Sequence, residues 1–327
     1  MRSSFFAIAL LLLVLQFLSC VRFTILPTPT VNPQLIVNGL FTPDSIWKIN
    51  VSKNRGIDNN DFLPEYVSDA LVSLWEEDSL LGQLAYAQNG NYTLDQYPRV
   101  NKRYRIEVEK EGFPTVKAID SIPQIPSEYN VSWDLSNPVP VTDELGGTFA
   151  SPRIFLDFQD VLGQKNYYKV SLAMRDSCNC ANGLDLFKDN LHLFKLLTKD
   201  PIVPPNSRKH ALPLFSDISF SDQQKQMIFF ADTSFYLQTF FKPIGDSTRF
   251  PLEQSNPQPP IRKEKVEIYL DFWSFNYDLF AFYNTYLTQA YNTADPFATH
   301  VNVNSNIQGG RGIFAGYQRE LILIYSH

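Results

Sequence analysis

The chain has 327 residues, of which 44% are hydrophobic and 14% are aromatic, and its formal net charge at pH 7 is −6. This composition is typical of a folded globular protein, and the length is sufficient for two domains. The 28 lysines and arginines are scattered along the chain, whereas binding to a phosphate backbone requires a clustered basic face. We therefore predict that nucleic acid is not a partner.

The first twenty residues have the layout of an export signal. Arg2 precedes an almost unbroken apolar run from Phe5 to Leu15, which is shorter than the roughly 20 residues that a membrane span needs. Leu18-Ser19-Cys20 follows and resembles a bacterial lipobox, in which the signal is cut before a cysteine that then carries lipid. We predict a signal peptide over 1–19, lipidation of Cys20 and anchoring in membrane lipid. The alternative is a plain signal peptide with a cysteine near its cut site.

Residues 20–33 are predicted to be an extended tether because Pro27, Pro29 and Pro33 lie among polar residues. From residue 34 the pattern becomes that of strands. Period-two alternation between turn signals predicts seven strands, at 35–41, 47–52, 70–75, 82–87, 92–94, 103–109 and 116–119. Such spacing over 34–122 predicts a β-sandwich, and the runs 69–74, 90–94 and 104–108 resemble those of immunoglobulin-like and carboxypeptidase-regulatory-like sandwiches.

Four prolines within residues 123–140 predict a linker between two domains. We expect 141–327 to form a larger antiparallel β domain, barrel- or sandwich-like, with one main helix over about 274–290 capped by Ser274. Its other predicted elements are a hairpin over 153–158 and 167–174, a possible helix over 186–197, and strands at 211–215, 226–230, 234–241, 266–272 and 321–325.

The main helix is predicted to be amphipathic. An apolar stripe recurs along it at three- and four-residue steps, formed by Phe275, Leu279, Phe282, Tyr286 and Ala290. Our interpretation is a helix packed on a sheet, and the alternative is an aromatic wall of a ligand site. The overall fold class is thus mainly β, with a sandwich followed by a larger β domain.

The glycine-rich segment Gly309-Gly310-Arg311-Gly312 has two interpretations. Glycine permits positive φ and close approach of backbones, so the segment fits a tight turn that leads into the last strand. It also fits a ligand loop whose N–H groups and Arg311 hold an anionic or polar group. It is not a dinucleotide-binding fingerprint, because no strand–glycine–helix order surrounds it. We favour the structural interpretation and keep the ligand loop as a hypothesis.

The cysteines other than Cys20 form one close pair, Cys178 and Cys180. Together with Met174 they are weak candidates for a soft metal such as Cu(I), although a small disulfide or two thiols fit as well. We predict no metal and no cofactor, and expect metal removal to leave the fold intact. The histidines lack a spacing suited to zinc, and no nucleophile elbow occurs, so no catalytic residues are predicted.

The C-terminal segment carries the most specific pattern in the chain. Asp295-Pro296-Phe297 is followed by Asn304-Ser305-Asn306-Ile307-Gln308 and then by residues 309–317. This is similar to the closing signature of a Bacteroidota lipoprotein family known as a domain of unknown function (numbered 4249). Asn166-Tyr167-Tyr168 and Phe215-Ser216-Asp217 agree with that family too. The chain departs from it with Gln308 where Glu is usual, so no role of that Glu carries over.

The resemblance implies an outer-membrane lipoprotein, of a kind thought to lie beside TonB-dependent outer-membrane receptors. Our main prediction is accordingly a binding or accessory lipoprotein without enzymatic activity, on a face of the outer membrane that the sequence leaves open. A structural or adhesive protein of the cell surface is the first alternative. A hydrolase is the second, and its candidate acid–base groups are Asp157, Asp160, Asp217 and Asp222.

Overall fold

A computed structural model describes residues 32–54, 64–142, 148–178, 191–194, 196–209, 212–231, 263–292 and 297–326. The strand predicted at 234–241 lies outside these residues. No helix in the described part of the chain has the length and apolarity to cross a membrane. The structure is mainly β with one main helix, which confirms the predicted fold class.

The first half of the structure is a sandwich of eight strands. They are β1 (Leu35–Phe41), β2 (Trp47–Lys53), β3 (Glu65–Tyr66), β4 (Leu71–Glu76), β5 (Ser79–Gln88), β6 (Asn91–Leu94), β7 (Arg103–Glu109) and β8 (Val116–Ser121). All seven predicted strands occur, and only the two-residue β3 was not predicted. Strand β5 pairs with β4 through its first half and with β6 through its second half, so the sheet folds over its own core.

The core of this sandwich is aromatic. Phe41, Trp47 and Tyr104 are almost completely buried, and their ring centroids lie 4.7 to 5.6 Å apart. Phe314 lies 4.7 Å from Phe41 and belongs to the same cluster although it comes from the last strand of the chain. The N-terminal sandwich is therefore completed by residues from the C-terminal end.

The second half contains the remaining elements. They are β9 (Tyr129–Thr142), β10 (Thr148–Gln159), β11 (Tyr167–Cys178), β12 (Leu191–Phe194), β13 (Leu196–Leu197), α2 (Pro205–Lys209), β14 (Leu214–Ser216), the 3-10 turn η1 (Asp217–Ser219), β15 (Gln224–Ala231), β16 (Lys263–Phe275), α4 (Tyr277–Asn292) and β17 (Arg311–Ser326). Strands β13-β15-β10-β9 form a four-stranded sheet that shares one apolar core with β11 and β16. Two sheets thus form a sandwich here as well.

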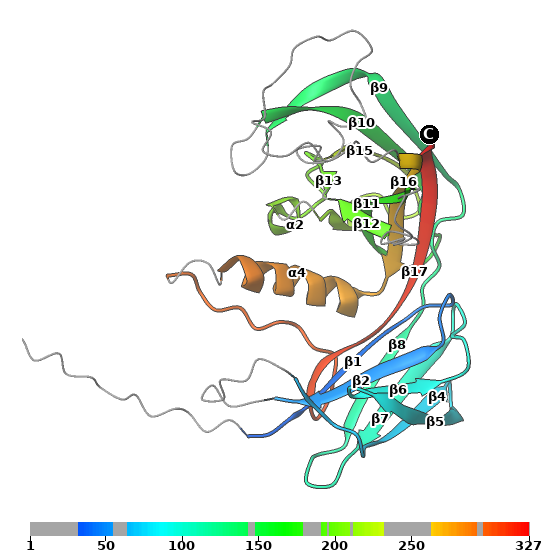
Figure 1. Ribbon diagram of the computed structural model, residues 1–327, viewed down its shortest axis with the longest axis vertical. Coiled ribbons are helices and arrows are strands. Elements are labelled where there is room, and N and C mark those ends of the chain that lie inside the picture. The colour runs from blue at the N-terminus through cyan, green and yellow to red at the C-terminus, as the bar shows by residue number, and fades with distance from the viewer. Residues whose placement is uncertain are drawn as a thin grey trace, which may run out of the picture. The chain divides into compact units, whose positions relative to one another are not determined.

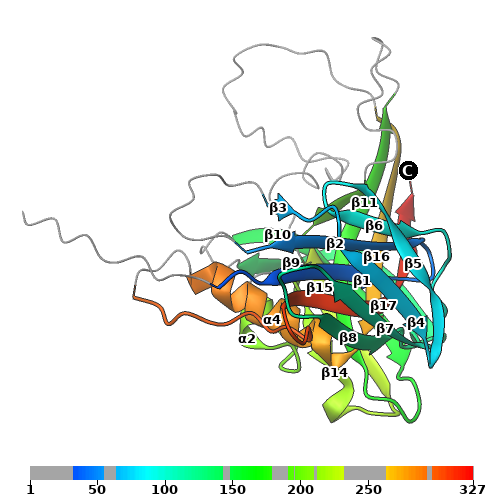
Figure 2. The ribbon, with the colours of Figure 1, turned by 90° about the horizontal axis from the view of Figure 1, so that it is seen from below.

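Strand β17 joins the two halves (Figures 1 and 2). Its first residues pair in parallel with β1, with Val37 opposite Gly312 and Gly39 opposite Phe314. Its later residues pair antiparallel with β16, where Trp273 is opposite Arg319. Residues 34–54 and 64–327 accordingly form one compact unit. The division into one domain over 34–122 and another over 141–327 stays a prediction.

A buried carboxylate ties β17 to two other elements. Asp120 of β8 is 8% exposed, and its carboxylate accepts hydrogen bonds from the N–H of Gly316 at 2.9 Å and from the side chain of Asn276 at 2.7 Å. Asn276 immediately precedes α4. Burial raises the pKa of Asp120 to about 6. The first sandwich, the start of the helix and the last strand therefore meet at one polar contact.

The helix α4 confirms the predicted main helix and the first part of its predicted apolar stripe. Leu279 is buried, and Phe282 and Leu287 pack in the same cluster as Phe275. Tyr286, which belonged to the predicted stripe, is 51% exposed. Only the later part of the inward face therefore differs from the prediction, because the partner surface and not periodicity alone selects which side of an aromatic-rich helix is buried.

Several sequence predictions in the second half were wrong. Much of the predicted linker 123–140 is strand β9, which tolerates Pro138 and Pro140 because it lies at the edge of its sheet, where a missing N–H breaks no ladder. The described end of the predicted helix 186–197 consists of the short strands β12 and β13. The rest of that helix, 186–190, lies outside the described residues.

Two element boundaries in the C-terminal part also differ. Ser274 is a buried strand residue whose hydroxyl donates to the backbone oxygen of Gln124 at 2.9 Å, so it does not cap α4. The last strand begins at Arg311 and not at Leu321. The polar run Gln318-Arg319-Glu320 hid this extension, because both faces of β17 carry polar residues there.

Candidate functional site

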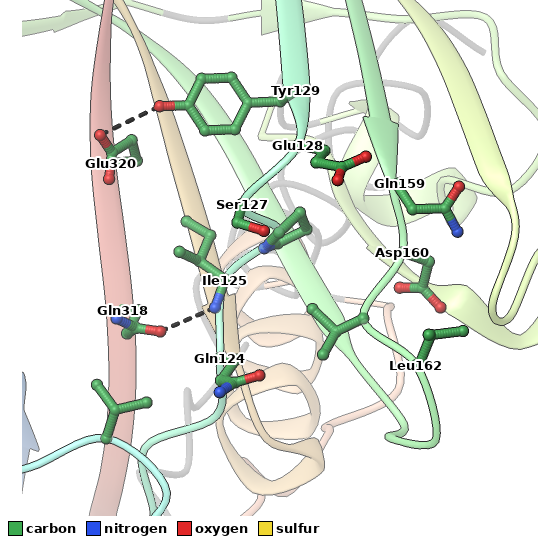
Figure 3. A pocket seen from close by; sticks show the side chains of 13 residues that line it. Gln124, Ile125, Ser127, Glu128, Tyr129, Gln159, Asp160, Leu162, Gln318 and Glu320 are labelled. Atoms are coloured by element: carbon green, nitrogen blue, oxygen red, sulfur yellow. Dashed lines mark hydrogen bonds between the residues drawn. The ribbon is translucent and has the colours of Figure 1, made fainter.

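A polar pocket of about 740 Å³ lies where the connection between β8 and β9 passes β17 (Figure 3). Its walls are the connecting segment 124–129, the loop 159–162 after β10, Gln318 and Glu320 of β17, and Val100. We call it the Gln318 pocket. Its volume is in the range of small-molecule sites, which are commonly about 300–1,000 Å³.

The alternation of side chains along β17 places two polar groups in this pocket. Gln318 and Glu320 lie opposite Ser274 and Phe272 of β16, whereas Arg319 points to the other face of the sheet. The side-chain oxygen of Gln318 accepts the N–H of Ile125 at 2.8 Å. Because that oxygen is engaged, the amide NH₂ of Gln318 is the part that remains available to a ligand.

A second contact fixes the neighbouring carboxylate. The hydroxyl of Tyr129 donates to Oε1 of Glu320 at 3.2 Å, as Figure 3 shows. Burial, followed by the nearby charge of Glu320, raises the pKa of Tyr129. The tyrosine therefore stays protonated at neutral pH and holds one oxygen of Glu320, which leaves the other oxygen as an acceptor.

The loop 159–162, which forms another wall of the pocket, is held in place by a buried carboxylate. Asp160 is 2% exposed, and its oxygens accept the hydroxyl of Tyr168 at 2.6 Å and the N–H of Asp222 at 2.9 Å. Burial and the bond to Asp160 raise the pKa of Tyr168. The N–H of Gly163 in turn donates to the side chain of Asp222 at 2.8 Å. These hydrogen bonds to Tyr168, Asp222 and Gly163 thus fix the conformation of the loop 159–162.

A second hollow of about 370 Å³ adjoins the pocket. It shares Ser127, Glu128, Tyr129 and Gln159 with the Gln318 pocket and continues onto the outer face of the four-stranded sheet. Its further polar lining residues are Asn130, Asp157 and Gln224. Gln226, next to them, donates its amide to Asp157 at 2.8 Å. The two hollows therefore form a polar surface interrupted only by the side chains they share.

The charge of this surface is negative. Glu128, Asp160 and Glu320 line the pocket and Asp157 lines the adjoining hollow, while no lysine, arginine or histidine is among the lining residues of either. On the same sheet, Lys225 of β15 forms an ion pair with Asp200 at 2.9 Å. The site accordingly disfavours anions.

The carboxylates proposed for a hydrolase are partly brought together. Asp160 and Asp217 both lie beside Asn166, whose N–H donates to Asp217 at 2.7 Å and whose side chain donates to Asp160 at 3.4 Å. Burial raises the pKa of Asp217. Asp157 points away from this group, toward the outer face of the sheet. Both oxygens of Asp160 and one oxygen of Asp217 thus accept hydrogen bonds from groups of the protein itself.

The glycine segment packs against backbone. Added Cβ atoms would lie 2.5 Å from the oxygen of Thr115 at Gly309, 2.6 Å from that of Leu35 at Gly310 and 2.1 Å from that of Val37 at Gly312. The side chain of Arg311 is exposed. Ile313 and Phe314, which follow, are buried as expected. Packing thus accounts for all three glycines, and the ligand loop stays a hypothesis.

The other predicted site residues give less information. Cys20 and Cys180 lie outside the described residues, as does the side chain of Cys178. Met174 is 2% exposed and packs in the core of the second half. No group of three or more histidine, cysteine, aspartate or glutamate side chains suited to a metal occurs among the described residues. The metal hypothesis therefore stays untested.

A buried lysine lies on the opposite face of the second half. Lys169 of β11 is 7% exposed, and its amine lies 3.2 Å from the ring centroid of Trp273 and 5.4 Å from that of Tyr283. Asp271, the nearest carboxylate in the same face, is engaged by Arg319 at 2.6 Å and Ser171 at 2.9 Å. Burial lowers the pKa of Lys169 to about 8.

Sequence reasoning singled out Asp160, which lines the pocket, but missed the connecting segment and the two residues of β17. Segment 124–129 was interpreted as linker, and the last strand was begun too late to include Gln318 and Glu320. A signal was present, because continuing the period-two pattern of β17 backwards from the inward-facing Ile322 places both residues on one face. Nothing in the sequence predicts that the segment 124–129 crosses that face.

One comparison with known proteins identifies the family. No curated protein matches the sequence significantly. The family model described as Domain of unknown function (DUF4249) matches residues 23–320, which include both sandwiches, the Gln318 pocket and the glycine segment. Since the match spans nearly the whole chain, the protein belongs to the DUF4249 family.

Proposed function

We propose that this protein is a lipoprotein of the outer membrane that binds a ligand, acting beside a TonB-dependent transporter and catalysing no reaction. The observation that carries the binding role is the Gln318 pocket. It combines a volume of about 740 Å³ with polar groups whose orientation is fixed by the fold. Fixed polar groups in a concave site give specificity without being rearranged on binding.

The proposed anchor rests on the sequence. Arg2, the apolar run Phe5–Leu15 and Leu18-Ser19-Cys20 support cleavage before Cys20 and attachment of lipid to its sulfur. A single acyl chain binds membranes only weakly, so several chains are needed for stable anchoring. The outer membrane and the transporter partner rest on the resemblance to Bacteroidota lipoproteins, and the face of the membrane is left open.

The absence of catalysis is part of the proposal. A general acid or base must reach the proton that it transfers. Asp160 is enclosed by Tyr168 and by the backbone of Asp222, and Asp217 is engaged by the backbone of Asn166. These contacts favour a structural role for both carboxylates, in which they position the loops around the pocket.

The anchor is tested by labelling cells with an alkynyl fatty acid. The wild-type chain and Cys178→Ala, which keeps Cys20, are expected to carry the label. Cys20→Ala is expected to lose it and to be released in soluble form or to stay unprocessed. Equal labelling of Cys20→Ala and the wild type would refute lipidation at this residue.

The partner is tested by affinity purification from detergent-solubilised outer membrane. We expect a TonB-dependent receptor to co-purify with the wild-type chain in near-stoichiometric amount. The matched control is Cys20→Ala isolated from the soluble fraction and mixed with the same membranes. If no such receptor is enriched with the anchored chain, the accessory role is wrong, whereas the binding role of the pocket is unaffected.

A further inference from the structure

We infer that the Gln318 pocket and the adjoining hollow bind a neutral oligosaccharide. This inference rests on the proposed binding function and names its ligand class. The two hollows share Ser127, Glu128, Tyr129 and Gln159, so a ligand that fills both must be extended. A chain of sugar rings has this form, and each ring presents hydroxyl groups around an apolar C–H face.

The hydrogen-bonding groups of the site are mixed in kind. Gln318 offers its NH₂, because its oxygen is held by Ile125. Gln159 offers its oxygen and one N–H, because the other N–H of its NH₂ donates to the backbone of Asp222 at 3.1 Å. Glu320 offers the oxygen that Tyr129 does not hold. A ligand that only donates or only accepts would leave part of this set unsatisfied, whereas a hydroxyl does both.

Some polar side chains of the site make no hydrogen bond to other described side chains or backbone and are free to adapt. Among them are the exposed side chains of Gln124 and Glu128, which lie on the connecting segment that lines the pocket (Figure 3). The site therefore combines polar side chains whose orientation is fixed with others that can change their orientation. This arrangement fits a ligand with several similar hydroxyls in different orientations.

Apolar side chains complete the lining. Ile125, Val161 and Leu162 lie in the pocket wall, and Leu162 is 74% exposed. A ligand that covers the exposed side chain of this leucine gains binding free energy, at about 25 cal/mol per Å² of apolar area buried. The C–H face of a sugar ring supplies such a cover while its hydroxyls reach the amides and carboxylates at the ring edge.

The negative charge of the site excludes anionic ligands and leaves cationic ligands as the alternative to be tested. With carboxylates and no basic residue in the lining, anionic sugars and phosphorylated ligands are repelled. The cationic side chains of a basic peptide would be attracted, but they only donate hydrogen bonds and could not accept from the NH₂ of Gln318. The mixed donor and acceptor set therefore favours a neutral ligand over a cation.

The test uses the full-length chain purified in detergent and isothermal titration calorimetry. The probes are cellohexaose, maltohexaose and chitohexaose as neutral chains, a polygalacturonate fragment as an anion and hexalysine as a cation. We expect at least one neutral probe to bind with a Kd between about 10 μM and 1 mM. Its affinity should change less than about twofold between 50 and 500 mM NaCl, because screening weakens only charge–charge attraction.

Variants locate the binding in the pocket. Gln124→Ala, which breaks no side-chain hydrogen bond among the described residues, should weaken the neutral probe by about three- to tenfold, as for the loss of one or two hydrogen bonds. Glu128→Gln keeps the size of the side chain and one oxygen acceptor but removes the charge. It should alter the affinity for the neutral probe less than about twofold. The matched control is Gln83→Ala, an exposed glutamine of β5 outside the pocket, which should leave the affinity unchanged.

Three results would overturn the inference. They are failure of every neutral probe to bind at about 10 mM, salt-sensitive binding of hexalysine that Glu128→Gln abolishes, and equal weakening by Gln83→Ala and Gln124→Ala. None of these results bears on lipidation or on the receptor, because the titration is made without membrane partners. A failed titration with successful labelling and co-purification would therefore reject the ligand class and keep the anchored accessory role.

Discussion

Gly312 has a backbone φ of 118°, and its missing side chain leaves room for the carbonyl oxygen of Val37. Alanine in its place would meet that oxygen at 2.1 Å in an unfavourable conformation. We expect Gly312→Ala to lower the free energy of unfolding by about 3 kcal/mol or more. Urea denaturation measures this, and the exposed neighbour Arg311→Ala is the control, with an expected change within about 0.5 kcal/mol.

Gly310 requires glycine for a different reason. Its φ is not positive, but a Cβ would lie 2.6 Å from the oxygen of Leu35 and 3.0 Å from Val116. Gly310→Val is therefore expected to destabilise through close backbone approach. If Gly310→Val kept the wild-type midpoint of denaturation while Arg311→Ala lost partner capture, the segment would be a ligand loop after all.

Lys169 makes stability depend on pH. Burial lowers its folded pKa from 10.5 to about 8, so between these values the unfolded chain binds more protons and stability rises with pH. Below pH 8 the charged amine costs on the order of 3 kcal/mol. Urea midpoints from pH 7 to 10 should rise for the wild type and for the exposed control Lys48→Met. Lys169→Met should remove this rise, and an unchanged slope in that variant would show that another group titrates.

At the scale of elements, Asn306 sets the start of β17. Its side-chain oxygen accepts the N–H of Phe314 at 3.0 Å and its NH₂ donates to the carbonyl of the same residue at 2.7 Å, so it pairs with the strand as a backbone would. Asn306→Asp keeps the size but replaces the donor by an acceptor. We expect a loss of about 1–3 kcal/mol in urea denaturation. Asn302→Asp, at an exposed position in the segment before β17, should change little.

The elements that local patterns determine were predictable from sequence. Strands such as Trp47–Lys53 and Arg103–Glu109 alternate cleanly because one face lies on a core and the other in water. The sequence did not predict the short strands at 191–197 or the polar part of β17, because their pairing partners decide their conformation. The Gln318 pocket combines both kinds of segment, and for that reason its residues could not be assembled from local patterns.

At the scale of the whole molecule, β17 belongs to both sandwiches. Phe314 is fully buried in the first core, and Ile322, on the same strand, packs on the second. We expect a single calorimetric unfolding transition. Phe314→Ala, which should cost about 3–5 kcal/mol, is expected to shift that transition as a whole. Leu323→Ala, 52% exposed on the same strand, is the control, and a wild-type thermogram with two separate peaks would mean that the halves unfold independently.

The parallel pairing of β1 with β17 has a consequence for biogenesis. The first strand of the fold pairs with β2 on one edge and receives its second partner, β17, only when the last segment of the chain has arrived. Until then the edge of β1 and the aromatic cluster beside it lack the cover that Phe314 and its strand supply. Contacts between the two ends of a chain are slow to form, and incomplete chains with open edges associate with one another. We therefore expect the chain to be prone to aggregation until its C-terminus is delivered, and a product truncated before β17 to fold poorly in both halves.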